Sequence, residues 1–244
     1  MALYSKGVET KNAILAAARQ LFYEKGYNET SVRELAALSE VNLGLIKYYF
    51  SSKSEIAKQL YIIIRKELNN LTRINGIDGD DCFSFLFRNL TELIYSLQNK
   101  SFGRFFVEIM REPVVEQFYQ ERIITSLKLY IKRPIVEEDY YMLTCVSIAA
   151  MKPALVNWNT NEDGNIDTLN VVQYYLEQYI HFLGESNVLY HQVLSKLNQF
   201  HFDVGARFTP ILVPLEGRQL TKIQENNFID EENRDASNSF WKQR

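Results

Sequence analysis

The stretch "NLGLIKYYFSSK", residues 42–53, decides how the first part of the chain folds. At about 100 degrees per residue, Leu45, Ile46 and Tyr49 fall on one arc of a helix. The opposite arc carries a glycine, a lysine and a second tyrosine: Gly44, Lys47 and Tyr48. The pattern therefore predicts that one tyrosine packs into a core and that the other is displayed.

The residues around this stretch predict three further helices. Gly26 stands where a first helix would end in a left-handed cap. Ser31 opens a Ser-x-x-Glu capping box for a short second helix that ends near Ser39. Asn42 caps the third helix, and Ser52 opens a second capping box for a fourth that reaches about residue 70. The two short helices and the turn between them have helix-turn-helix spacing.

Two residues of this segment favour an anionic partner. Gly44 inside a helix costs roughly 1 kcal/mol relative to alanine, which is explained if a large molecule approaches that face. Lys53 stands in the first turn of the fourth helix, where the helix dipole disfavours a cation unless an anion such as phosphate binds there. The alternative is a helical hairpin with incidental surface residues. We expect double-stranded DNA as the partner.

The charge distribution agrees with this expectation, although it is a weak argument alone. The formal net charge is −3, but residues 1–70 carry 10 Lys and Arg against 7 Asp and Glu, and residues 71–244 carry 17 against 23. The cationic excess is therefore confined to the segment that contains the predicted helix-turn-helix.

The whole chain is predicted to be all-α, with no alternating strand pattern and no internal repeat. Further helices are expected at about 81–98, 101–111, 114–132, 137–158, 167–184 and 187–201. The glycines and aspartates of "RINGIDGDDC", residues 73–82, mark a boundary. We divide the chain into a helix-turn-helix domain at 1–52, a connecting helix and linker at 53–75, a larger helical domain at 76–204 and an irregular tail at 205–244.

Several functional classes receive no support from the sequence. It lacks nucleotide-binding, zinc-protease and serine-hydrolase motifs, so we expect no enzyme, metal or cofactor. A calcium loop that began at Asp78 would need glycine where Phe83 stands and glutamate where Asn89 stands. Cys82 and Cys145 match no metal or redox spacing and are expected to be buried free thiols. Without a membrane span or secretory signal, a soluble cytoplasmic protein is expected.

The segment "TKNAILAAARQLFYEKGYNETSVRELAALSEVNLGLIKYYFSSKSEI" strongly resembles the DNA-binding part of tetracycline-repressor (TetR) family regulators. The resemblance covers roughly residues 9–60 and implies an all-helical homodimer whose larger domain binds a small-molecule effector. It implies phosphate contacts at Thr30, Ser31, Tyr49 and Lys53, and base contacts at Asn42, Leu43, Lys47 and Tyr48.

The sequence departs from the family pattern at the turn and in the recognition helix. Members often have glycine at the turn position of Glu40, where a non-glycine residue is strained if its φ is positive. Lys47 replaces a frequent tyrosine. These departures affect the turn and the operator sequence rather than the fold.

The larger domain offers two sets of candidate residues. With the resemblance, a two-fold four-helix dimer interface is favoured over simple burial in a monomer, and its candidates are Leu143, Val146, Ala150, Val172, Leu176, Tyr179 and Leu183. An effector pocket, suited to an apolar or flat ligand, has as its aromatic and thioether candidates Phe83, Phe87, Phe105, Phe106, Met110 and Trp158.

Three functions remain open at this point. The first is a ligand-responsive repressor, and the second is a ligand-independent architectural or cell-division-linked DNA-binding protein on the same scaffold. The third is a small helical enzyme or binding protein whose first seventy residues are incidental. Salt-dependent DNA binding separates the third from the others, and a ligand screen separates the first two.

Overall fold

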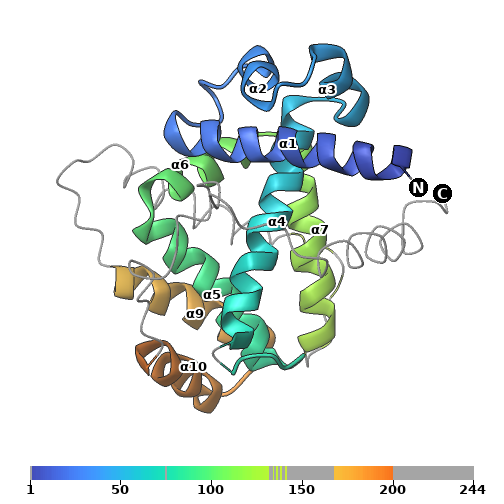
Figure 1. Ribbon diagram of the computed structural model, residues 1–244. Helices are drawn as coiled ribbons and strands as arrows, with labels where there is room; N and C mark the ends of the chain where they lie inside the picture. The colour runs from blue at the N-terminus through green and yellow to red at the C-terminus, as the bar shows by residue number, and fades with distance from the viewer. Residues whose placement is uncertain are drawn as a thin grey trace. The chain divides into compact units, whose positions relative to one another are not determined.

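The computed structural model describes residues 2–74, 76–131 and 168–199, together with positions 134, 136, 138 and 141. The described residues fall within one compact unit, Met1–Val213. The helices, shown in Figure 1, are α1 Ala2–Glu24, α2 Val32–Ser39, α3 Leu43–Tyr49, α4 Lys53–Ile74, α5 Cys82–Gln98, α6 Lys100–Ile109, α7 Pro113–Tyr130, α9 Thr168–Leu183 and α10 Asn187–Gln199. The predicted all-α class is confirmed. The expected helix at 137–158 lies almost entirely outside the described residues, and the expected tail at 205–244 lies wholly outside them.

The local signals at the start of the chain form as the sequence predicts. Gly26 has a φ of 96° after the end of α1. The Ser31 side chain accepts from the Glu34 amide, and the Glu34 side chain accepts from the Ser31 amide, so the capping box is complete. The Asn42 side chain caps α3 by accepting from the Leu45 amide at 2.8 Å. We call α1, α2, α3 and the loops between them the head.

Helix α4 connects the head to the rest of the chain, which we call the body. It packs against α1 in the head and against α5, α6 and α7 in the body. Figure 1 shows α2 and α3 close to the end of α4 where that helix begins. The helix is four residues longer than expected because its apolar face continues to Leu68 and Leu71 and keeps packing against the core.

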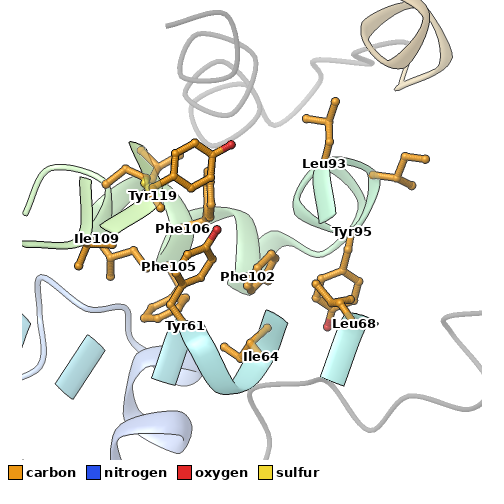
Figure 2. Close-up of a cluster of buried hydrophobic side chains, with 14 of the residues drawn as sticks. Tyr61, Ile64, Leu68, Leu93, Tyr95, Phe102, Phe105, Phe106, Ile109 and Tyr119 are labelled. Atoms are coloured by element: carbon orange, nitrogen blue, oxygen red, sulfur yellow. The ribbon is translucent and has the colours of Figure 1, made fainter. Parts of the chain in front are cut away.

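An aromatic core joins α4 to α6 and α7. Tyr61 of α4 lies 5.8 Å from Phe106 between ring centroids, and Phe106 lies 6.1 Å from Tyr119 of α7. Figure 2 shows these rings gathered with Phe102 and Phe105 above α4. Because Tyr61 and Tyr119 carry hydroxyls into this core, their burial requires polar neighbours.

Those neighbours form what we call the buried polar cluster. It draws side chains from α4, α5 and α7: Tyr61, Arg65, Asn89, Glu92, Tyr119 and Arg122. Glu92 accepts from the Tyr61 hydroxyl through Oε1 and from Arg65 Nε, at 2.9 Å, through Oε2. The cluster therefore places charged groups next to the aromatic core.

The apolar stripe of α9 packs inward, against α5. Four residues predicted to form a dimer interface, Val172, Leu176, Tyr179 and Leu183, are buried within the single chain. A wide apolar face can serve two neighbours in one chain as well as it serves a second copy. The role of these residues in a dimer interface stays a prediction. The other candidates, Leu143, Val146 and Ala150, lie outside the described residues.

The predicted pocket residues also pack into the core. Phe87, Phe105, Phe106 and Met110 are buried, and the half-buried Phe83 lies against Phe87. Phe105 stacks on Phe22 of the head at 5.7 Å, so this ring packs at the junction between head and body. The role of these residues in an effector pocket stays a prediction. The last candidate, Trp158, lies outside the described residues.

The structure also bears on the expectations about the two cysteines and about membrane spans. Cys82 is a thiol at the start of α5, but it is half-buried rather than buried. Cys145 is not among the described residues. Within the described part of the chain, no helix is long and apolar enough to cross a membrane.

Candidate nucleic-acid interface

Helix α3 displays one face, as the sequence predicts. Tyr48 is 79% exposed, Tyr49 is half-buried and Ile46 is buried. The two tyrosine rings meet edge to face at 5.1 Å, so the half-buried ring supports the exposed one. Leu45, predicted to be core, is 39% exposed, because the helix has only seven residues and buries a narrower arc than its periodicity suggests.

A groove beside α3 brings several of the predicted contact residues together. Its lining comes from the start of α2, from α3 and from the loop before α4: Ser31, Val32, Arg33, Leu43, Ile46, Lys47, Phe50, Ser51, Ser52 and Lys53. Three of these residues are cations, and the hydroxyls can donate to phosphate oxygens. Asn42 and Gly44, two further predicted contacts, are exposed at the start of this helix.

The environment of Gly44 agrees with a close approach. A Cβ placed there would lie 3.3 Å from Asn42 Oδ1, the oxygen that caps α3. Apart from the two adjacent residues and the backbone of the helix itself, nothing else in the described part of the chain lies within 4 Å of that Cβ position. Because Gly44 has no side chain, the exposed arc of α3 is open at this position.

Thr30 is not placed to contact a phosphate through its side chain. It is 1% exposed, and its hydroxyl donates to the Gly26 carbonyl at 2.7 Å. The sequence cannot show this, because a threonine before a helix is equally suited to a phosphate contact and to closing a loop. Ser31, the next residue, is exposed and remains a candidate.

Lys53 has an intramolecular role that the sequence does not predict. Its Nζ donates to the carbonyls of Tyr27 at 2.9 Å, Thr30 at 3.0 Å and Asn28 at 3.5 Å, and it lies 4.2 Å from the centroid of the Tyr27 ring. An ammonium has three donors, so these carbonyls can occupy all of them. Burial lowers the pKa of Lys53, although the nearby carboxylates of Glu112, Glu108 and Glu29 act to raise it.

Helix α6 of the body holds the end of α1 and the loop that follows it. Arg104 Nη2 donates to the Tyr23 carbonyl at 2.8 Å, and the Asn28 amide donates to Glu108 at 3.1 Å. Gly26 lets these side chains approach, because a Cβ there would lie 3.0 Å from Glu108 and 3.2 Å from Arg104. Helix α6 therefore contacts the head directly, in addition to the covalent route through α4.

The turn between α2 and α3 carries the strain that the sequence suggests. Glu40 has a φ of 55°, the one positive value at a non-glycine position in the described part of the chain. Its amide donates to the carbonyls near the end of α2, and the Val41 amide donates to Ala36 at 3.2 Å. The left-handed residue thus closes α2 and aims α3 away from it.

The segment that forms these caps, the turn and the exposed helix is similar in sequence to known proteins. Residues 14–60 match the family described as bacterial regulatory proteins, tetR family. The chain carries a TetR-family amino-terminal domain. The TetR resemblance of the sequence is thereby confirmed for this segment, which includes α2, α3 and the start of α4.

Two curated proteins illustrate the similarity of this TetR-type segment. "Probable HTH-type transcriptional regulator YttP" of Bacillus subtilis is 43% identical over 53 residues, which are 22% of this chain and 26% of that protein. The biofilm operon icaADBC negative transcriptional regulator IcaR of Staphylococcus aureus is 27% identical over 103 residues, 42% of this chain and 55% of that protein. The chain thus spans about a quarter and about half of these two relatives.

Among solved structures, the chain is similar to a Rhodococcus sp. protein assigned to the TetR-family transcriptional regulators. The identity is 18%, the TM-score is 0.49, and the match covers 72% of this chain and 99% of that protein.

Sequence reasoning missed the contacts of α6 with the head and the buried polar cluster. The cluster has a signal in the sequence, since Asn89, Glu92 and Ser96 recur at helical spacing among apolar residues and are all buried. Polar residues at three successive core positions indicate a polar network rather than an apolar pocket.

Proposed function

We propose that the chain is a sequence-specific DNA-binding transcriptional repressor of the TetR type that binds a small-molecule effector. The observation that carries the proposal is the exposed face of α3, which displays Tyr48 and Lys47 in a segment that matches the TetR family. Lys47 also lines the groove beside α3, together with Arg33. Negative regulation is supported by the name of IcaR, which describes a negative transcriptional regulator. We propose that the protein acts in the cytoplasm.

The proposed contacts fall into two groups. Asn42, Leu43, Lys47 and Tyr48 would read base edges in the major groove, because they lie at the exposed start and face of α3. Ser31 and Tyr49 would contact phosphates on either side. Lys53 is assigned to holding the loop before α2 rather than to a phosphate, since its donors are met by carbonyls.

We propose the same division of the chain as the sequence suggests, with the head at 1–52, the connection at 53–75 and the effector-binding and dimerisation region at 76–204. A homodimer would place two heads about 34 to 36 Å apart on successive turns of the major groove. The exposed side of α9 and α10 offers Tyr174, 59% exposed, and Val188, 63% exposed, to such a partner. The residues at 137–158 remain proposed members of the interface.

Effector and DNA would be coupled through α6. A shift of α6 on effector binding moves Arg104 and Glu108, which hold the loop that leads into α2. A small displacement of the heads is sufficient to disturb simultaneous docking in two grooves. Coupling of this kind is reciprocal and is typically worth about 1 to 3 kcal/mol.

The test begins with selection of bound duplexes from a random DNA pool, followed by fluorescence anisotropy against the selected site. The wild type should bind it with an affinity that falls steeply with salt. Tyr48→Ala should change the selected sequence, whereas Leu129→Ala, at an exposed position of α7, should leave the selected sequence unchanged. Absence of salt-dependent duplex binding would overturn the proposal.

The distribution of binding sites along the chromosome separates a local repressor from an architectural DNA-binding protein. Genome-wide footprinting should find binding beside one or a few operons if the chain is a local repressor. Sites scattered along the chromosome with no ligand response would instead support a ligand-independent protein on the same scaffold.

A further inference from the structure

The buried polar cluster contains one anion whose hydrogen bonds are met inside the chain. Both oxygens of Glu92 are occupied, one by the Tyr61 hydroxyl and the other by Arg65 Nε. Glu92 is 6% exposed, so this pairing is what permits its charge in the core. Each oxygen of Glu92 therefore has one hydrogen-bond partner before Arg122 is considered.

Arg122, from α7, is the second cation of the cluster and is poorly paired. Its Nη1 donates to Asn89 Oδ1 over a long 3.4 Å, and its Cζ lies 5.1 Å from the centroid of the Tyr119 ring. Its Nε and Nη2 are buried, and no hydrogen-bond partner for either atom occurs among the described residues. The residue as a whole is half-buried, so part of the side chain reaches the surface.

The two atoms without partners form one edge of the guanidinium. Nε and Nη2 point the same way in the plane of the group and match the spacing of two carboxylate oxygens, which they bind through parallel hydrogen bonds. A buried edge of this kind destabilises the folded chain if it is left unsatisfied. The geometry is thus specific for a planar anion with two oxygens.

The net charge of the cluster favours a ligand with a single negative charge. Arg65 and Arg122 are positive and Glu92 is negative, which leaves one positive charge in surplus. Aromatic side chains lie around that charge, with Tyr119 against Arg122 and Phe106 against Tyr119. A ligand that complements these surroundings carries one anionic group on an apolar or aromatic body.

We propose that Arg122 binds the carboxylate of a small monocarboxylic acid with an aromatic or aliphatic body. This inference rests on the proposed function, because such an acid would be the effector of the repressor. It adds an anionic group to the apolar or flat ligand that the aromatic content of the sequence favours. Binding at Arg122 would act on Tyr119 of α7, whose ring packs against Phe106 of α6, the helix that contacts the head.

The test uses phenylacetate, indole-3-acetate and decanoate, each paired with its neutral amide, against the full chain without DNA. Thermal shift and titration calorimetry report binding. At least one acid should raise the melting temperature with increasing concentration, and its amide should bind at least tenfold more weakly. Because DNA is absent, a negative result here leaves the DNA-binding proposal standing.

Variants locate the site. Arg122→Met should lose at least tenfold in affinity for the acid. Arg122→Lys keeps the charge but not the pair of parallel donors, so it should lose less affinity for the acid than Arg122→Met does. It replaces Arg122→Met in the test if the methionine variant does not fold. Arg111→Met removes an exposed arginine between α6 and α7 and should bind as the wild type does. The proposal is wrong if no acid binds better than its amide, or if both Arg122 variants bind like the wild type.

Discussion

Lys53 and Arg122 are both cations placed in half-buried surroundings, and they differ in how their donors are met. Lys53, at the junction between head and body, has carbonyls at 2.9, 3.0 and 3.5 Å from its ammonium. Arg122, inside the body, has one bond of 3.4 Å and two buried nitrogens without partners among the described residues. Both cations lie close to a tyrosine ring.

The difference separates a structural cation from one that is free to bind. A cation whose donors are satisfied by the chain stabilises the loops that supply the carbonyls, and removing it leaves those carbonyls unmet. A cation with unmet donors destabilises the free protein, and a ligand can recover that energy on binding. The four predictions below test this contrast and the polar contacts of the head, beginning with the largest expected effect.

Lys53→Met should lower the free energy of unfolding by about 2 kcal/mol, because the loop carbonyls lose a charged donor. Urea denaturation followed by circular dichroism measures the change. The control is Lys47→Met on the exposed face of α3, which should change stability by less than about 0.5 kcal/mol. If Lys53→Met unfolds like the wild type and only makes the salt dependence of DNA binding shallower, the ammonium is a phosphate contact after all.

Arg122→Met should raise the free energy of unfolding by about 1 kcal/mol, since it removes a surplus buried charge while Glu92 keeps Arg65 and Tyr61 as partners. The same denaturation experiment, without added acids, measures it. Arg111→Met should leave the value unchanged. A loss of stability in Arg122→Met would show that the guanidinium is a structural group like Lys53.

Glu40→Gly tests the strained position of the head. Its φ of 55° favours glycine, so the substitution should stabilise the chain by about 0.5 kcal/mol after the entropy of the added glycine is subtracted. Ala37→Gly, an exposed helical position of α2, should instead destabilise by about 1 kcal/mol. Equal effects of the two glycines would mean that the turn is not strained.

Glu34 should give the smallest effect because its carboxylate lies at the surface. A hydrogen bond from Lys25, followed by the bonds from Ser31, lowers the pKa of Glu34 from 4.5 to about 2. A lowered pKa stabilises the folded state above pH 4.5, and this contribution is lost as the pH falls through about 2. The wild type should therefore lose stability more steeply over this range than Glu34→Gln.

Denaturation midpoints measured at several acidic pH values follow the effect of Glu34. In a Lys25→Met background, the substitution Glu34→Gln should change the pH dependence of stability much less than it does in the wild type. Parallel curves for the wild type and the single variant Glu34→Gln would contradict the assignment of the lowered pKa.

Local signals allowed much of the head to be predicted. The capping box at Ser31, the cap at Asn42 and the left-handed Gly26 each depend on a few neighbouring residues, and each forms as expected. The exposed Tyr48 and buried Ile46 follow from helical periodicity alone. These features could be read because the physical cause lies within one turn of helix.

What the sequence determined by itself is therefore the order of helices, their caps and the face that α3 displays. Tertiary structure alone decided that Leu176 packs inward and that Thr30 closes a loop. It also decided that Lys53 donates to carbonyls of residues 23 to 26 positions earlier in the chain. Finally, it decided that Nε and Nη2 of Arg122 lack partners among the described residues. The reason is that burial and hydrogen-bond satisfaction depend on groups brought together from distant parts of the chain, and helical periodicity shows which face is apolar but not what covers it.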